Sequence, residues 1–303
     1  MAFSLIILGS SSALPTSDRN LTAHLLNVNE RFFLIDCGEG TQLQLRKLKV
    51  NFNRIDHIFI SHLHGDHIFG LPGLISTFNL LGRKKILHLY ADEVLEIILN
   101  SFLANFINKL SFNLVFHKLK SDSHNLIFEN SSITVHSFPL KHKIPTCGFV
   151  FREKPHMRKI RKEMIEYYHI SIKDILNIKN GEDYVTNDGT CISNSLLTTD
   201  PPPAKSYAFC SDTVFYEEVI SSIKNIDILY HEATFADEDS DLAKITLHST
   251  ASDAAKIAKI ANAKKLIIGH FSSRYKDVSH LLEQANKIFP ETLLAKDGMK
   301  IDF

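Results

Sequence analysis

The feature of this sequence that most restricts its fold is a cluster of metal-binding side chains that directly follows a short apolar stretch. The segment His62-Leu63-His64-Gly65-Asp66-His67 comes after His57–Ile60, which is predicted to be a strand. In extended backbone the first two histidines share one face, and a turn at the glycine lets the following Asp-His pair reach a second point nearby. Imidazole and carboxylate together suit zinc or a related divalent ion. The strand is therefore expected to end at a metal centre.

Further candidate ligands lie at the ends of later predicted strands. A lone histidine in such a place is more often structural, so each candidate alone is weak evidence. Their recurrence at the same kind of position is what a layered fold produces when its loops converge on one edge. The candidates are His142, Asp212 and His270, after the predicted strands Ser132–Pro139, Tyr207–Cys210 and Leu266–Ile268.

Short apolar strands and helical patterns alternate along the rest of the chain. Helices are predicted over Gln42–Lys49, Leu71–Leu81, Asp92–Lys109 and Ser249–Asn262. Further strands are predicted at Phe3–Leu8, His24–Val28, Phe32–Ile35, Ile86–Tyr90, Leu114–Lys118, Gly148–Phe151 and Ile226–Tyr230. This mixture favours an α+β fold in which two sheets pack face to face with helices outside, a four-layer αβ/βα sandwich. We expect residues 1–303 to form a single domain of this kind.

One segment departs from this pattern and is predicted to be an insertion at about residues 152–190. It begins with a basic run and continues as a helical stretch to about Asn180, followed by a hairpin at Asp183–Cys191. A solvated surface insertion is one interpretation, because most charge runs are solvated. The other is an arm that grips phosphates. The basic residues of the run are Arg152, Lys154, Arg158, Lys159, Arg161 and Lys162, against the single acid Glu153.

Composition excludes several classes of protein. The 34 basic and 34 acidic residues cancel, so any nucleic-acid surface must come from local clustering. The four cysteines are widely spaced and indicate neither a zinc-finger nor a disulfide framework. Because the chain has no signal-peptide pattern and no apolar run of membrane-spanning length, we expect a cytoplasmic protein without a membrane partner.

The motifs together resemble the metallo-β-lactamase superfamily, and within it the ribonuclease Z family almost from end to end. The H-x-H-x-D-H segment after a strand is the superfamily signature, and Leu34-Ile35-Asp36-Cys37-Gly38 resembles the strand and turn that precede it. More specific are Ser211-Asp212-Thr213, His231-Glu232-Ala233-Thr234, His248-Ser249-Thr250 and His270-Phe271-Ser272-Ser273-Arg274-Tyr275. Lactamases and thiolesterases are not expected to have these later motifs.

The resemblance implies a site with two zinc ions per subunit and assigns its ligands. His62, His64 and His142 would hold one ion, Asp66, His67 and His270 the other, and Asp212 would bridge them. Asp66 would also orient the attacking water and accept its proton. His248, supported by Glu232, would be the general acid for the leaving ribose 3′-oxygen. From the residues alone, His248 would be assigned no more than a place at a helix N-terminus.

The resemblance also implies the substrate, precursor tRNA cut at its 3′ side to leave a 3′-hydroxyl, and a homodimer whose arm serves the partner's active site. No DNA substrate is expected. Arg19, Asn20 and Arg274 would contact RNA near the cut, although spacing alone fits a surface arginine or a salt bridge equally well. The chain departs from the family twice: Ser17 replaces the lysine of a Pro-x-Lys-x-Arg-Asn pattern, and the arm reads Ile170-Ser171-Ile172-Lys173-Asp174 where a Gly-Pro motif is usual.

Two alternative functions differ in class. A small-molecule phosphodiesterase of the same superfamily would share every metal ligand, but it would need neither a long basic grip nor a dedicated acid. A non-catalytic RNA-binding scaffold built on a dead hydrolase would be expected to have lost ligands, and all seven are present. Cleavage of precursor tRNA, rather than of a small phosphodiester, discriminates among them.

Overall fold

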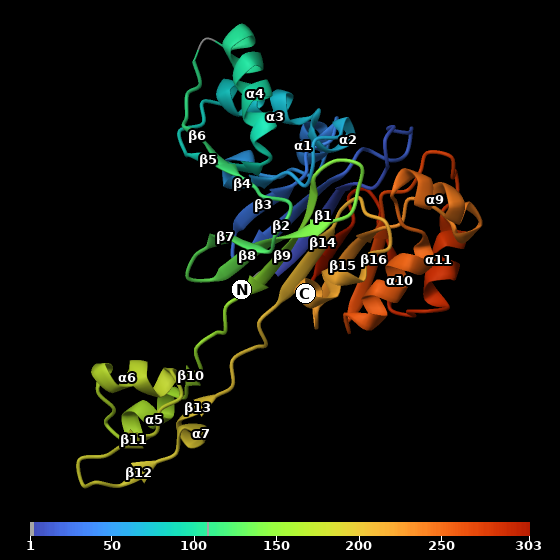
Figure 1. Cartoon of the computed structure of the whole chain (residues 1–303). Coiled ribbons are helices and arrows are strands. Elements are labelled where there is room, and N and C mark those ends of the chain that lie inside the picture. The colour runs from blue at the N-terminus through green and yellow to red at the C-terminus, as the bar shows by residue number, and fades with distance from the viewer. Residues whose placement is uncertain (1–2, 108) are drawn as a thin grey trace. The chain divides into compact units, whose positions relative to one another are not determined.

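A computed structural model describes residues 3–107 and 109–303 (Figure 1). The chain divides into two compact units. One is made of residues up to Arg152 together with Ser206–Phe303, and the other is Glu153–Lys205. Of the helices that the structure describes, none combines the length and apolarity needed to cross a bilayer.

The first sheet of the large unit joins an antiparallel half to a parallel half. Strands β1 to β3 are antiparallel neighbours, whereas β3, β4, β5 and β6 run parallel. The carboxyl ends of β3 and β4 therefore meet at one edge, where Asp36 and Ser61 follow them. In order across the sheet the strands are β18 (Lys300–Asp302), β1 (Phe3–Gly9), β2 (Ala23–Val28), β3 (Arg31–Ile35), β4 (Ile55–Phe59), β5 (Leu87–Ala91) and β6 (Leu114–Lys118).

The second sheet repeats this arrangement with later parts of the chain. Strands β14 to β17 are parallel, so their carboxyl ends also share an edge. In order the strands are β17 (Thr292–Leu294), β16 (Lys265–Gly269), β15 (Ile228–Glu232), β14 (Ser206–Cys210), β9 (Thr146–Glu153), β8 (Ile133–Leu140) and β7 (Asn125–Glu129).

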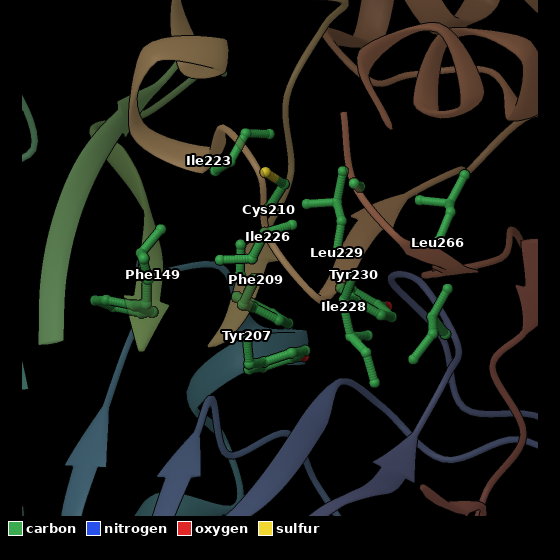
Figure 2. Packing of buried hydrophobic residues seen from close by; sticks show 14 of the residues in the cluster. Phe149, Tyr207, Phe209, Cys210, Ile223, Ile226, Ile228, Leu229, Tyr230 and Leu266 are labelled. Atoms are coloured by element: carbon green, nitrogen blue, oxygen red, sulfur yellow. The ribbon is translucent and has the colours of Figure 1, made fainter. Parts of the chain in front are cut away.

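Two buried clusters hold the layers together. Between the sheets, the Phe59 ring lies 5.6 Å from that of Phe149 and 5.5 Å from that of Phe151, centroid to centroid. Figure 2 shows the same core around Phe209 and Tyr230, side chains of β14 and β15. On the outer side of the first sheet, helices α1 (Thr41–Lys47), α3 (Leu71–Leu80) and α4 (Glu93–Phe106) bury leucines against it. Helices α10 (Ala251–Ile260) and α11 (Ser279–Asn286) pack on the second sheet. The predicted four-layer sandwich is confirmed.

Several short elements of the large unit escaped prediction. Helix α11 buries only Leu281 and Ala285 among polar residues, so its periodicity is weak. Strands β7, β17 and β18 are three to five residues long. The remaining short helices are α2 (Gly65–Ile68), α8 (Ile220–Ile223), α9 (Ser240–Thr246) and the 3₁₀ turns η1 (Phe52–Arg54), η2 (Glu217–Val219) and η3 (Asp237–Asp239).

The small unit has a core of its own. Ile170, Ile178 and Leu197 are its buried apolar residues. Its ends are tied by the Glu153 backbone N–H, which donates to the Lys205 carbonyl at 2.8 Å. Strands β11 and β12 form the hairpin that the sequence predicted. Its elements are β10 (Lys159–Ile160), α5 (Lys162–Tyr167), α6 (Ile172–Lys179), β11 (Tyr184–Val185), β12 (Cys191–Ile192), α7 (Asn194–Leu197) and β13 (Thr198–Thr199).

Candidate metal centre

The H-x-H-x-D-H segment bends where its glycine predicts. His64 has extended backbone, with φ −68° and ψ 147°, and helix α2 begins at the next residue, Gly65. The two histidines before the bend stay close, with His62 Nε2 3.1 Å from His64 Nδ1. Asp66 and His67 lie in the first turn of the helix and so face a different point.

The loops that follow β4, β8, β14 and β16 bring all seven predicted ligands together. Their ligand atoms form groups in which every atom lies within 4.8 Å of the others. One group contains His62, His64, His142 and Asp212, and another contains Asp66, His67 and His270.

Asp212 lies between the two groups and presents one carboxylate oxygen to each. Its Oδ2 is 3.4 Å from His62 Nε2 and 3.8 Å from His142 Nε2. Its Oδ1 is 3.4 Å from His67 Nε2 and 3.2 Å from His270 Nε2. Within the described residues Oδ1 is buried and accepts no hydrogen bond. A buried carboxylate oxygen without a donor, ringed by imidazole nitrogens, fits a site for divalent ions of the zinc type.

Hydrogen bonds behind the ligands fix the orientation of three imidazole rings. His67 Nδ1 donates to Asp36 Oδ2 at 2.7 Å, and His142 Nδ1 donates to the Leu247 carbonyl at 2.8 Å. His270 Nδ1 lies 2.9 Å from Thr234 Oγ1. In each case the remaining nitrogen, Nε2, faces the cluster, as a metal ligand requires. Burial lowers the pKa of His62 to about 4, which keeps that imidazole neutral.

Strained backbone accompanies this arrangement. Asp36, Leu247 and His270 have φ values of 56°, 57° and 60°, a left-handed conformation that costs free energy for a residue with a side chain. Gly70 permits a further close approach, because a Cβ atom there would lie 2.1 Å from the Gly38 carbonyl oxygen. The loops after β3 and β4 are thereby held against each other, and the Gly70 N–H donates to the Cys37 carbonyl at 2.9 Å.

Beside the cluster, a buried carboxylate holds a histidine. Glu232 ends β15, and its Oε1 lies 2.9 Å from His248 Nδ1. The backbone N–H groups of Thr213 and Ser249 donate to the same oxygen, and that of Thr234 donates to Oε2. Burial alone would lower the pKa of His248, but the Glu232 carboxylate outweighs it and raises that pKa to about 9. Because Nδ1 is hydrogen-bonded to Glu232, the protonated ring can donate its second proton, on Nε2, to another partner.

The cluster and His248 open onto one cavity of about 550 Å³. Its walls include Ala13 to Pro15, Phe69 and Lys143 beside the proposed ligands. The site therefore combines a place for divalent ions, a proton donor and space for a substrate.

Comparison with known proteins places this chain in a family. The chain is 46% identical to ribonuclease Z of Bacteroides fragilis strain YCH46 over 299 residues, 99% of this chain and 98% of that protein. It is 46% identical to ribonuclease Z of Porphyromonas gingivalis strain W83 over 301 residues, 99% of each. The chain belongs to the ribonuclease Z family.

A family model and solved structures extend the comparison. The model of the family described as Anti-Pycsar protein Apyc1 matches residues 3–288, so the chain falls within that family as well. Human tRNase Z, short form, is similar in structure with a TM-score of 0.72 and 27% identity, covering 98% of both chains. The metallo-β-lactamase fold protein YhfI of Bacillus subtilis is 17% identical with a TM-score of 0.70 over 100% of both chains, a likeness of fold alone.

The other residues with a predicted substrate role lie in varied surroundings. Arg19, which the ribonuclease Z resemblance pointed to, donates from Nη2 to the carbonyls of Ser272 and Tyr275. Asn20 donates to Asp297 Oδ2 at 2.8 Å. Arg274 pairs with Asp239 at 3.2 Å. Each of these side chains thus binds another segment of the large unit.

Except for Arg152, which lies in β9 of the large unit and donates to the Ser222 and Lys224 carbonyls, the basic residues of the predicted arm belong to the small unit. Arg158 donates hydrogen bonds to Thr198 Oγ1 and Asp200 Oδ1. Lys159, Arg161 and Lys162 are exposed, and Lys154 is half-buried. The unit as a whole carries eight lysines and arginines and eight acids, and five of the eight basic residues lie within its opening segment, residues 153–162.

Sequence reasoning missed the residues that position the ligands. Asp36 accepts from the Ser61 N–H at 2.7 Å and from Ser61 Oγ at 2.8 Å, besides holding His67. A signal was present, because Asp36 directly follows a predicted strand. Thr234 likewise lies in a quoted motif, but only the fold shows that its hydroxyl links His270 to Glu232.

Proposed function

We propose that this protein is a metal-dependent endoribonuclease that removes the 3′ trailer of precursor tRNA by hydrolysing one phosphodiester bond and leaving a 3′-hydroxyl. The observation that carries the proposal is the Glu232–His248 pair, 2.9 Å apart, beside the His/Asp cluster. The cluster alone would suit many phosphodiesters. A ribose 3′-oxygen is a poor leaving group and needs an acid. That the substrate is RNA is inferred from the relatives named ribonuclease Z.

The proposed cofactor is a pair of zinc ions. His62, His64 and His142 would hold one, Asp66, His67 and His270 the other, and Asp212 would bridge them. Support comes from the two oxygens of Asp212, each turned to a different pair of histidines. When bound, such a pair of ions activates water and neutralises charge at phosphorus. The nitrogen and oxygen donors would also accept manganese or iron.

Protein side chains would handle the protons. Asp66 is placed to orient the attacking water and accept its proton, since its carboxylate faces the cavity and is fixed by the Ala13 N–H at 2.8 Å. His248 would protonate the leaving 3′-oxygen through Nε2, while Glu232 stabilises the imidazolium. General acid catalysis of this kind contributes roughly 10²–10⁴-fold.

For RNA binding we propose that Lys159, Arg161 and Lys162 of the arm contact tRNA phosphates, with Lys154 and Arg158 supporting them. Phosphate contacts of this type position RNA by shape rather than by sequence. Arg19 and Asn20 would act by shaping the loop at residues 15–20, whereas Arg274, with 43% of its side chain exposed, can still reach a phosphate. We also propose a cytoplasmic homodimer in which the arm of one subunit serves the active site of the other.

The test is the cleavage of a 3′-extended precursor tRNA by the zinc-loaded protein, with the cut mapped to the nucleotide. We expect a single cut near the discriminator nucleotide that leaves a 3′-hydroxyl and is lost in His64→Ala. His124→Ala, at an exposed histidine outside the cluster, is the matched control and should cut normally. An intact precursor together with hydrolysis of a small phosphodiester would replace the tRNA assignment with the small-molecule phosphodiesterase.

A further inference from the structure

We propose that a second cavity, which shares His248 with the cavity at the metal centre, receives the nucleotide immediately upstream of the cut, with Phe215 as its stacking platform. This inference rests on the proposed function and gives the bound RNA a direction across the site. The cavity measures about 500 Å³ and lies among the segment after β14, helix α9 and the start of α10.

His248 is the wall that the two cavities share. It lines the cavity of the proposed ligands, with His64, Asp66 and Asp212, and it also lines the second cavity. Its Nδ1 is held by Glu232, so the ring cannot turn away without losing that hydrogen bond. A substrate atom that accepts a proton from this ring therefore sits at the boundary between the two spaces.

The chemistry of the cut decides which part of the RNA lies on which side. Hydrolysis that leaves a 3′-hydroxyl breaks the bond between phosphorus and O3′ of the upstream ribose. Water adds to phosphorus, O3′ takes the proton of His248, and the phosphate stays on the trailer. The phosphate lies at the proposed ligands, so the upstream ribose lies at His248 and its base extends into the second cavity.

The lining of this cavity suits a nucleotide. The Phe215 ring lines the cavity, and the Lys256 ammonium, which pairs with Asp253 at 3.3 Å, lies over that ring at 5.8 Å from its centroid. An aromatic face beside a cation is a common unit for binding single-stranded nucleic acid, because a base stacks while the cation meets the backbone. Lys244, paired with Asp241 at 3.6 Å, adds a second ammonium to the lining.

The carboxylates that line the cavity favour a base over a phosphate beside them. Asp237 accepts from Ser252 Oγ at 2.5 Å, and Asp253 accepts from the Thr250 N–H at 3.3 Å as part of the cap of α10. Both are held in place and both would repel a phosphate, yet they can accept a hydrogen bond from a base amino group. The cavity is therefore a base site in which the charges of two lysines and two aspartates balance.

The experiment pairs protein variants with precursors that each lack one base. One precursor is abasic at the last nucleotide of the tRNA, and the other is abasic at the first nucleotide of the trailer. The quantity measured is kcat/KM for wild type, Phe215→Leu and Tyr216→Leu. Leucine keeps the apolar packing of Phe215 against the core but cannot stack, and Tyr216 is the neighbouring aromatic residue that does not line the cavity.

We expect loss of the upstream base to lower kcat/KM of wild type about 10-fold, the scale of one base–aromatic stack. Phe215→Leu should lower kcat/KM on the intact precursor by a similar factor. For this variant, removal of the upstream base should cause no further loss of kcat/KM, whereas removal of the trailer base should have the same effect as in wild type. Tyr216→Leu should match wild type on all three substrates. Equal sensitivity of wild type and Phe215→Leu to the upstream base, or a coupling of Phe215 to the trailer base, would overturn the assignment.

Misfolding of Phe215→Leu and failure of the proposed function can be told apart from failure of the cavity assignment. If Phe215→Leu fails to fold, as judged by circular dichroism, Lys256→Met at an exposed position replaces it. That variant should lose about 3-fold in kcat/KM on the intact precursor and less on the upstream-abasic one; equal losses on both would refute the cavity assignment. A wild-type protein that leaves every precursor intact would sink the proposed function itself, and this inference with it.

Discussion

The metal edge of the large unit and the basic segment of the small unit both carry proposed functional residues, but they are built differently. At the metal edge, loops after strands of two seven-stranded sheets converge, and most ligands are buried among fixed hydrogen bonds. In the small unit, strands of two residues and helices of four to eight surround a core of three buried side chains. Its cations lie on the surface.

The difference teaches where each region tolerates change. A metal centre needs donor atoms placed to within a fraction of an ångström, which rigid strands and hydrogen bonds at the back of the rings provide. A surface that grips phosphates needs charge and reach, and those survive the loss of any one side chain. Substitutions should therefore have steep effects at the metal edge and graded effects in the arm.

The largest effect is expected from Asp212→Asn. The amide keeps the shape of the side chain but removes the charge and turns one of the two atoms that face the histidine pairs into a donor. We expect activity to fall at least about 1,000-fold because one proposed ion loses its ligand and the other keeps only a neutral oxygen, and the metal content by mass spectrometry to fall below two ions per chain. A variant that retained both activity and metal would show that Asp212 is not a bridge.

His248→Gln should come next, with a signature that a structural role would not give. We expect kcat on precursor tRNA to fall about 10²–10⁴-fold with metal content unchanged, because the leaving 3′-oxygen loses its proton donor. A p-nitrophenyl phosphodiester has a leaving group that departs without a proton, so its hydrolysis should change by only a few-fold. Equal losses on both substrates would contradict the acid role.

Asp36→Asn tests the hydrogen bonds behind the ligands. This carboxylate accepts from Ser61 N, Ser61 Oγ and His67 Nδ1, and an amide nitrogen in place of one oxygen would meet donors instead of acceptors. Metal affinity should fall about 10–100-fold, measured by competition with a chelator. Unchanged affinity would mean that the fold alone orients His67.

The sequence predicted the metal edge better than the arm for a physical reason. Ligands follow strands, and strands have a readable period, so His142, Asp212 and His270 could be assigned to loop positions before the fold was known. The resemblance then supplied the pairing, which depends on contacts between residues such as His67 and His270, more than 200 positions apart. The strained backbone at Asp36 and His270 has no counterpart in periodicity and was not predictable.

The fold also decided what Arg19 and Arg274 contact. Charge patterning finds cations but does not show whether another part of the chain neutralises them. The carbonyls of Ser272 and Tyr275, which bind Arg19, lie more than 250 positions further along the chain. In the small unit the same limit applies, since the partner of Arg158, Asp200, follows 42 residues later.

The smallest effect on activity is expected from substitutions in the arm. The double variant Lys159→Gln and Lys162→Gln removes two exposed charges and leaves the core of the small unit untouched. We expect KM for precursor tRNA to rise a few-fold at unchanged kcat, and the slope of log KM against log salt to flatten by about 0.7–0.9 for each phosphate that the variant no longer neutralises. Lys173→Gln, an exposed lysine of α6 outside the basic run, is the control and should change neither KM nor the slope. A fall in kcat at constant KM would mean that the arm affects the geometry of the metal edge. The contrast between steep effects at the metal edge and graded effects in the arm would then no longer hold.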